Sequence, residues 1–310
     1  MSENAMSLTT ALGRGWDRMV QMLFKPFDLT KWLVVAFTAW LAGLADGGGG
    51  SGSSDAEGDG GDVIVAAESF WEWLTEHELM AGLIAVAVLL LVALVVLVLW
   101  LSSRGKFMFL DNVVHDRALV RAPWSEYRRE GDSLFGFRLL LILLGVPAAV
   151  GLVGMAAFLA FGPDGWVHQG GAAMVAGAVA TAALGSVVIL TLIYLMFFLD
   201  AFVVPLMYAH RVGVVEGWRR FFAHFSARPW WFLLAGLFVF LLAIVIFWAV
   251  IVTGFATCCL GFLLLVLPYV GTVLLLPVLV TYRAFTVEFL GQMDEAVRLE
   301  ARPALPENPA

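Results

Sequence analysis

Leu89-Leu-Leu-Val-Ala-Leu-Val-Val-Leu-Val-Leu99 is the stretch that determines the class of this protein. It lies within 25 consecutive uncharged residues that separate Glu78 from Arg104. A helix needs roughly 20 apolar residues to cross the hydrocarbon core of a bilayer, which is about 30 Å thick. The stretch therefore predicts a transmembrane helix and, with it, an integral membrane protein.

The composition of the whole chain supports this class. Of its 310 residues, 61% are hydrophobic and 14% are charged, whereas a soluble domain is roughly 25% charged. The chain has two cysteines and a net charge of −7. These values argue against a soluble enzyme, a nucleic-acid-binding protein and a disulfide-stabilised scaffold.

The other apolar runs predict an all-α protein with six transmembrane helices arranged as three hairpins. The first run is the shortest, because Trp32 to Ala45 gives only 14 uncharged residues before Asp46. Its helix reaches full length only if it begins near Asp28 and Lys31 extends its amine towards the headgroups. A cleaved signal peptide ending near Ala45 is the alternative. The predicted spans are residues 28–45, 79–102, 138–163, 172–199, 230–252 and 262–282.

The distribution of charge predicts the orientation. With the N-terminus inside, all 18 Lys and Arg residues fall in the inner segments, as the positive-inside rule requires. We therefore expect a bacterial inner-membrane protein with both termini in the cytoplasm. Residues 1–290 would form one membrane domain, with a flexible acidic outer loop at 46–62 and a cytoplasmic tail at 291–310.

The three hairpins look like copies of one unit, which predicts an internal triple repeat. Each begins with a tryptophan-containing inner segment, and the second helix of each ends in an aromatic and acidic stretch. The alternative is that aromatic residues simply gather at membrane interfaces. The tryptophans are Trp16, Trp124 and Trp218, and the acidic ends are Asp111, Asp200 and Glu288.

Two further segments predict helices that lie in the membrane interface. Residues 63–78 are amphipathic and acidic, and we expect them on the outer surface. On the inner side, Trp218 and the phenylalanines after it can enter the acyl boundary while Arg219 and Arg220 meet lipid phosphates. We weigh specific recognition of anionic lipids against an ordinary interfacial elbow, which is the commoner case.

The ionisable residues nearest the membrane are the three acids at the inner ends of the hairpins. Apolar residues continue past Asp200, so we expect it to be partly buried in an ion pair, with Arg211 or with an arginine of a neighbouring hairpin. A substrate or proton site is the alternative. Tyr269 and Thr272 form the most polar patch inside a predicted span.

No motif for catalysis, metal binding or cofactor binding is found. The histidines lack metal-ligand spacing, and the acidic loop lacks the bidentate glutamate that a calcium loop needs at its twelfth position, Ala66. Glycine loops for phosphate and nucleophile elbows are also missing from the sequence. We therefore expect no enzyme, no metal and no cofactor.

The tryptophan elbows, the hairpin spacing and the Phe-Leu-Asp ends resemble a broad group of poorly characterised six-helix bacterial membrane proteins. That group is similar to the membrane domain of some glycerophosphoryl diester phosphodiesterases. The matching positions are Trp124 and Trp218, with Phe109-Leu-Asp111 and Phe198-Leu-Asp200. The resemblance implies the architecture and no activity, because the phosphodiesterase catalytic domain has no counterpart in the sequence.

These observations favour a non-catalytic membrane protein that serves as a scaffold or accessory or interacts with lipids. The expected partners are membrane lipids, another membrane protein or a second copy of the chain, and not nucleic acid. The alternative is a carrier or flippase for an apolar or amphiphilic compound. That function predicts a cavity lined by Tyr269, Thr272 and Asp200.

Overall fold

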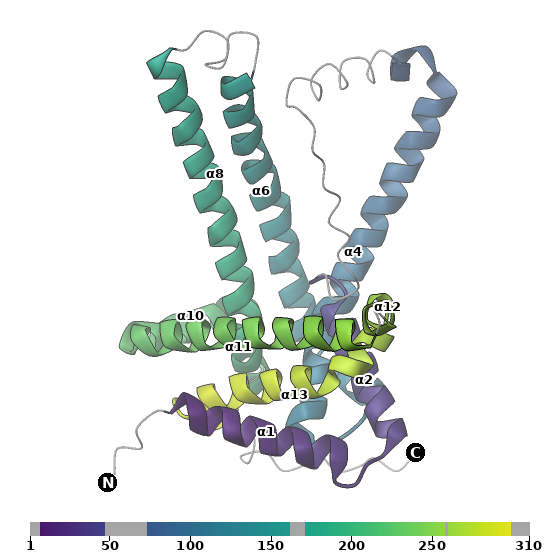
Figure 1. Ribbon diagram of the computed structural model, residues 1–310, viewed down its shortest axis with the longest axis vertical. Coiled ribbons are helices and arrows are strands. Elements are labelled where there is room, and N and C mark those ends of the chain that lie inside the picture. The colour runs from purple at the N-terminus through teal and green to yellow at the C-terminus, as the bar shows by residue number, and fades with distance from the viewer. Residues whose placement is uncertain (1–6, 47–72, 162–170, 258–259, 299–310) are drawn as a thin grey trace. The chain divides into compact units, whose positions relative to one another are not determined.

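The computed structural model describes residues 7–46, 73–161, 171–257 and 260–298, and all regular structure in these ranges is helical (Figure 1). This agrees with the predicted all-α class. The predicted outer loop after Asp46, most of the outer interfacial helix and the end of the tail lie outside the described residues.

Five helices are long and apolar enough to span a membrane. They cover Glu78–His115, Arg128–Ala160, Met174–His210, Pro229–Ala256 and Val270–Gly291. The third combines α8 (Ala172–Phe198), the π-helical turn η1 (Leu199–Val203) and α9 (Val204–His210). The others are α4 (Glu78–His115), α6 (Arg128–Phe161), α11 (Pro229–Ala256) and α13 (Val270–Gly291).

The helix expected at residues 28–45 is α2 (Leu29–Gly43), which has 15 residues. At a rise of about 1.5 Å per residue it is roughly 22 Å long, which is shorter than a bilayer core of about 30 Å. Asp28 caps its N-terminus by accepting hydrogen bonds from the backbone N–H groups of Thr30 and Lys31. The structure therefore fixes a shorter helix than the sequence predicted.

The chain divides into two compact units. We call Met1–Ser51, Leu99–Phe135 and Phe198–Ala310 the first unit, and Gly52–Val98 and Gly136–Phe197 the second unit. The boundaries fall within α4 and α6 and at the end of α8. α4 and α6 thus each give their apolar part to the second unit and their more polar part to the first.

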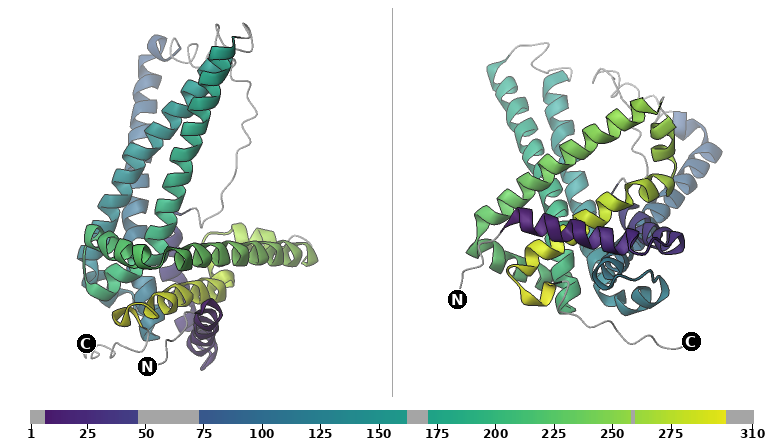
Figure 2. Two further views of the ribbon diagram at one scale, coloured as in Figure 1. Left: turned by 90° about the vertical axis from the view of Figure 1, so that its left-hand side faces the viewer. Right: turned by 60° about the horizontal axis from the view of Figure 1, so that its bottom comes forward.

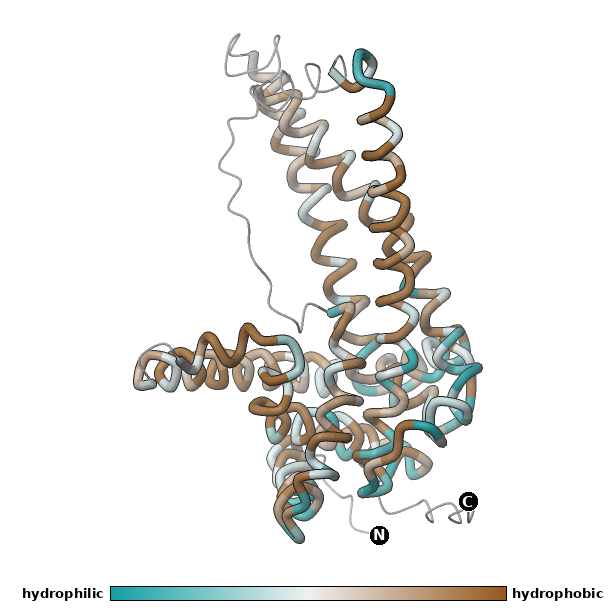
Figure 3. Tube along the Cα trace, turned by 90° about the vertical axis from the view of Figure 1, so that its right-hand side faces the viewer, coloured by the Kyte–Doolittle hydropathy of each residue, from teal (hydrophilic) through white to brown (hydrophobic). Residues whose placement is uncertain are grey.

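The second unit consists of apolar helical segments. Their hydrophobic character along the trace is visible in Figure 3. Gly185 of α8 lies against α6, because a Cβ at this position would stand 3.4 Å from side-chain atoms of Leu152 and Val153. Large apolar side chains such as Leu89, Leu143 and Ile193 are exposed. A surface of this kind is stable where lipid covers it.

In the first unit, α1 (Leu8–Phe24) lies along α13, as the two views of Figure 2 show. The contact is close, because a Cβ on Gly15 would stand 3.0 Å from the backbone nitrogen of Phe285. Buried methionine, leucine and valine side chains of α1, α2, α4 and α13 form the core of this unit. The remaining helices are α5 (Arg121–Glu126), α10 (Val214–Ala227), α12 (Leu260–Val266) and the 3-10 turn η2 (Glu295–Val297).

The sixth predicted span is not one helix. It is divided into α12 and α13 by Leu267, Pro268 and Tyr269, and Tyr269 has a φ of 71°. A proline lacks the N–H that continues a helix, and its ring collides with the preceding turn. The prediction of a continuous helix over 262–282 was therefore wrong at this point.

The first predicted hairpin also differs from the expectation. Asp46 was assigned to an outer loop and Lys106 to an inner segment, yet the two form an ion pair. Ser102 Oγ donates to the carbonyl oxygen of Ala42 over 2.7 Å, so the C-terminal end of α2 lies beside residues 102–106 of α4. The structure thus places Asp46 beside Lys106, two residues that the sequence analysis had expected in an outer loop and an inner segment.

Candidate functional site

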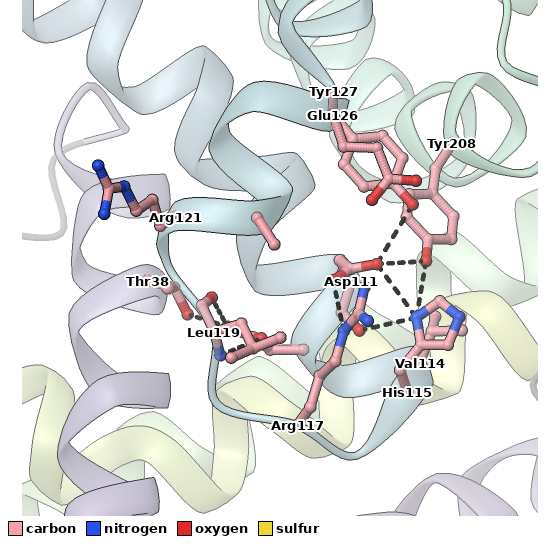
Figure 4. A network of polar contacts seen from close by, with 12 residues as sticks. Thr38, Asp111, Val114, His115, Arg117, Leu119, Arg121, Glu126, Tyr127 and Tyr208 are labelled. Atoms are coloured by element: carbon pink, nitrogen blue, oxygen red, sulfur yellow. Dashed lines mark hydrogen bonds and ion pairs between the residues drawn. The ribbon is translucent and has the colours of Figure 1, made fainter. Parts of the chain in front are cut away.

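Asp111 is the centre of a buried polar cluster in the first unit (Figure 4). Its side chain is completely buried. Arg117 donates to Oδ2 from Nε at 3.0 Å and from Nη2 at 2.7 Å. The hydroxyls of Tyr127 and Tyr208 donate to Oδ1 at 3.2 and 3.0 Å. Both carboxylate oxygens are thus occupied by donors from this chain.

Local backbone geometry brings these groups together. Asp116 has a φ of 56°, a left-handed conformation that reverses the chain after α4, so that Arg117 points back to Asp111. Tyr127 lies between α5 and α6 and stacks on Tyr208 with ring centroids 4.9 Å apart. Burial and the charge of Asp111 raise the pKa of Tyr127 well above its ordinary value. The hydroxyl therefore stays protonated and remains a donor.

Arg211 lies at the edge of the Asp111 cluster. Its guanidinium lies 4.0 Å from the ring centroid of Tyr127 and forms an ion pair with Glu126. Of the two partners expected for Asp200, Arg211 pairs with Glu126 instead. Arg211 has a left-handed φ of 56° at the end of α9, and this directs the chain towards α10.

Asp200 occupies a second cluster, where the predicted alternative partner is found. Lys106 donates to Oδ1 over 2.7 Å and Arg283 over 3.2 Å. Arg283 also donates to the backbone carbonyl of Asp200 over 2.9 Å. Because Lys106 binds Asp46 as well, two acids and two bases neutralise one another. The side chains of Lys106 and Arg283 are each only 4% exposed.

Glu288 and the polar patch in the sixth span complete the predicted set. Glu288 pairs with Arg14 over 3.3 Å and joins α13 to α1. The Tyr269 hydroxyl donates to the backbone oxygen of Leu33 over 2.8 Å, and Thr272 is buried. Glu288 and Tyr269 therefore join distant parts of the chain.

The sequence analysis missed one ion pair, in which Arg104 is buried and Asp132 is partly exposed. Arg104 binds both carboxylate oxygens of Asp132, at 2.8 and 2.9 Å, and its guanidinium lies over the rings of Trp100 and Trp124. Trp124, expected to face lipid, thus packs on an arginine of α4. A tryptophan at an interface gives no signal for such a partner, because the two residues lie 20 positions apart in sequence.

Contacts within the protein also hold the predicted interfacial elbow, which is α10. Trp218 is buried and packs against Phe221. Arg219 and Arg220 both pair with Glu216, one turn earlier on α10. These two bonds hold the guanidinium groups that the sequence assigned to lipid phosphates.

The end of α9 and the segment after α13 meet in a smaller cluster. His210 Nε2 lies 2.7 Å from Oδ2 of Asp294, and His224 Nε2 lies 3.6 Å from the same oxygen. Burial opposes ionisation of Asp294, but hydrogen bonds from His210 and the Ala296 N–H outweigh it and lower the pKa of the carboxyl.

An apolar groove lies between α1, α11 and α13, with a volume of about 1020 Å³. None of the three residues predicted to line a carrier cavity lines this groove. The groove is lined by Thr9, Leu12, Gly13, Trp16, Asp17, Val239, Leu242, Ala243, Ile246, Phe247, Pro277, Val278, Leu279, Thr281 and Tyr282.

The arrangement fixes charges in place and leaves an apolar space. Within the described ranges, no three His, Cys, Asp or Glu residues are placed to hold a metal ion. Cationic donors of the chain bind the carboxylates of both Asp111 and Asp200, and tyrosine hydroxyls also bind Asp111. These clusters join helices that are distant in sequence.

The long apolar helices and the paired buried charges define an all-helical, multi-pass membrane protein. The chain belongs to the Family of unknown function (DUF7544), whose model matches residues 6–293. No curated protein and no solved structure matches the chain significantly.

Proposed function

We propose that this chain is a non-catalytic inner-membrane protein that interacts with lipids and serves as a scaffold or accessory to a membrane partner. The observation that carries the proposal is the contrast between the buried charges and the groove. The charges of the Asp111 and Asp200 clusters are neutralised inside the chain, while the groove offers an apolar surface to an amphiphile.

The geometry of Asp111 supports a structural role over a catalytic one. A general base must reach its substrate within hydrogen-bond distance. Asp111 is completely buried, and Arg117, Tyr127 and Tyr208 occupy its two oxygens. We propose that neither a metal nor a cofactor takes part.

We further propose that both termini face the cytoplasm. Arg18 of α1 donates to the backbone oxygens of Val113 and Val114 at the C-terminal end of α4. Arg14 of the same helix binds Glu288 near the end of α13. These contacts support an N-terminal helix on the same side as the basic ends of α4 and α13.

The triple repeat remains part of the proposal. In two of the three expected copies, the segment that begins one hairpin binds the acid that ends another. Tyr127 donates to Asp111, and Arg14 pairs with Glu288. This regularity supports three related hairpins.

A carrier or flippase is the second candidate, and the groove favours it as well. An apolar or amphiphilic solute would need no charged residue within the membrane, and the groove walls are almost entirely apolar. Its cavity would involve α1, α11 and α13 and not the polar patch at Tyr269.

The test combines two measurements on full-length protein. Native mass spectrometry after release from lipid nanodiscs should detect retained lipid. Proteoliposomes should show no protein-dependent flux of apolar amines or fluorescent lipid analogues. Release of bare protein from every lipid mixture would contradict the lipid-interacting function, and reproducible flux would establish the carrier instead.

A further inference from the structure

We propose that the groove between α1, α11 and α13 binds an acyl chain of a phospholipid whose headgroup carries a protonated primary amine, held by Asp17. The inference deepens the lipid-interacting function proposed above and rests on it. It adds the place of binding and the chemical class of the headgroup.

The walls of the groove fit a hydrocarbon chain. Leu242, Ala243 and Ile246 of α11 face Val278 and Leu279 of α13 across it. Burying CH₂ groups on such a surface is favourable relative to water. In a membrane, the surrounding lipid offers the same apolar environment, so the walls set the shape of the occupant and cannot select its headgroup.

The side chains that can select the lipid headgroup lie on α1. Asp17 lines the groove, is exposed, and has no hydrogen bond or ion pair within the described part of the chain. Trp16, also on the groove, has 57% of its surface exposed. An ammonium group is attracted both to a carboxylate and to the face of an indole ring. This pair therefore favours a cationic group at the mouth.

A phosphate can be bound next to that ammonium. Arg14 precedes Asp17 by three positions, so the two side chains neighbour each other on the helix surface. The Arg14 side chain is 64% exposed, and its contact to Glu288 comes from Nη1. A guanidinium has five N–H donors, so others remain for a phosphate oxygen. An adjacent base and acid match the phosphate and the amine of a zwitterionic headgroup.

A lipid with a net negative headgroup fits this mouth less well. Its phosphate could also meet Arg14, but it would bring no positive charge to Asp17. The carboxylate would then face either water or the negative headgroup. Charge complementarity thus separates an aminophospholipid from a glycerol phospholipid with the same acyl chains.

The first experiment exchanges the charge of Asp17. Full-length protein is placed in nanodiscs of equal parts phosphatidylethanolamine and phosphatidylglycerol with identical chains, and the retained lipid is identified by native mass spectrometry. We expect the ethanolamine lipid to dominate. Because an exposed ion pair is worth about 0.2–1 kcal/mol, D17N should lower the preference by about 1.4- to fivefold. D17K should favour the glycerol lipid.

A second variant tests the groove without changing charge. Gly13 lines the groove, and a Cβ there would meet no atom within 4 Å. Gly13→Leu therefore fills space intended for the acyl chain and also improves the helix propensity of α1. We expect it to reduce the amount of lipid retained. Gly151→Leu on α6, whose Cβ also meets nothing within 4 Å, is the matched control.

The outcomes separate the two proposals. If lipid is retained but neither D17N nor Gly13→Leu alters its identity or amount, the groove assignment is overturned and the lipid-interacting function stands. Bare protein in all mixtures overturns both. An equal loss of preference in E295Q, which removes an exposed acid of η2 away from the groove, would show a non-specific charge effect and would also overturn the assignment.

Discussion

The two units of this chain share α4 and α6, but they bury different kinds of side chain. In the first unit, Lys106, Asp111 and Arg283 are among the most buried residues, and each has charged partners. In the described part of the second unit, the buried side chains are those of three alanines, Ala149, Ala156 and Ala178, and of one charged residue close to the unit boundary, Arg138, while the larger apolar side chains are exposed or partly exposed. The first unit therefore depends on specific polar pairs, whereas the second depends on close backbone approach and on lipid.

The same comparison explains where single substitutions will have large effects. Removing one member of a buried ion pair leaves an uncompensated charge in a medium of low dielectric constant. Changing a lipid-facing leucine leaves the surrounding hydrocarbon able to adjust. The expected effects below follow this difference from the largest to the smallest.

Asp111→Ala should be the most damaging change in the first unit. Arg117 would lose its partner, and two tyrosine hydroxyls would lose their acceptor. We expect a loss of about 3–5 kcal/mol in the free energy of unfolding, measured by thermal and chemical denaturation in nanodiscs. An unchanged midpoint would contradict the view that this cluster holds the unit together.

Asp200→Asn should cost less, about 2–3 kcal/mol. Asp200 is 28% exposed, and Lys106 keeps Asp46 as a partner. A double-mutant cycle with Lys106→Met should give a coupling energy of about 0.5–3 kcal/mol. Strict additivity of the two substitutions would show that the ion pair is not formed in the membrane.

Gly185→Leu tests the close packing of α8 on α6 in the second unit, because it changes the size of the side chain and not its charge. Its added side chain meets Leu152 and Val153 of α6, so α6 and α8 must separate. Overpacking of this kind costs about 1–3 kcal/mol. Hydrogen exchange in nanodiscs should rise in α6 and α8, while the first unit keeps its protection. Gly151→Leu, which points into open space, should leave exchange unchanged.

The cluster at Asp294 predicts a dependence on pH. Its pKa is lowered from an ordinary 3.8, so its stabilising contribution is complete above that value and is lost as the pH falls through the lowered pKa. Asp294→Asn should flatten the acid side of the stability profile. If the free energy of unfolding of the wild type does not change between pH 5 and pH 3, the stabilising role of the Asp294 carboxylate is contradicted.

Arg219→Ala should have the smallest effect. Its side chain is 79% exposed, and its partner Glu216 also binds Arg220. Exposed pairs of this kind contribute little to stability. The melting temperature and the retained lipid should both match the wild type. A selective loss of anionic lipid in this variant would instead support specific recognition at the elbow.

Most of the fold class could be predicted from the sequence, and most of the site could not. The five long apolar helices follow from runs such as Leu89 to Leu99. The break at Pro268 was readable in principle, since proline interrupts helical hydrogen bonding. The partners of Asp111 and Asp200 could not be predicted. Basic residues near helix ends are common, and the sequence gives no distance between an acid and each candidate base.

Hydropathy is a sum over neighbouring residues, so the sequence by itself determined that this chain is helical, apolar and multi-pass. Which acid meets which base was decided only by the tertiary structure. Lys106 binds Asp46 and Asp200, which lie 60 and 94 positions away. The groove likewise exists only because α1, α11 and α13 meet. Such contacts depend on how separate helices pack, and no local property of the chain encodes that packing.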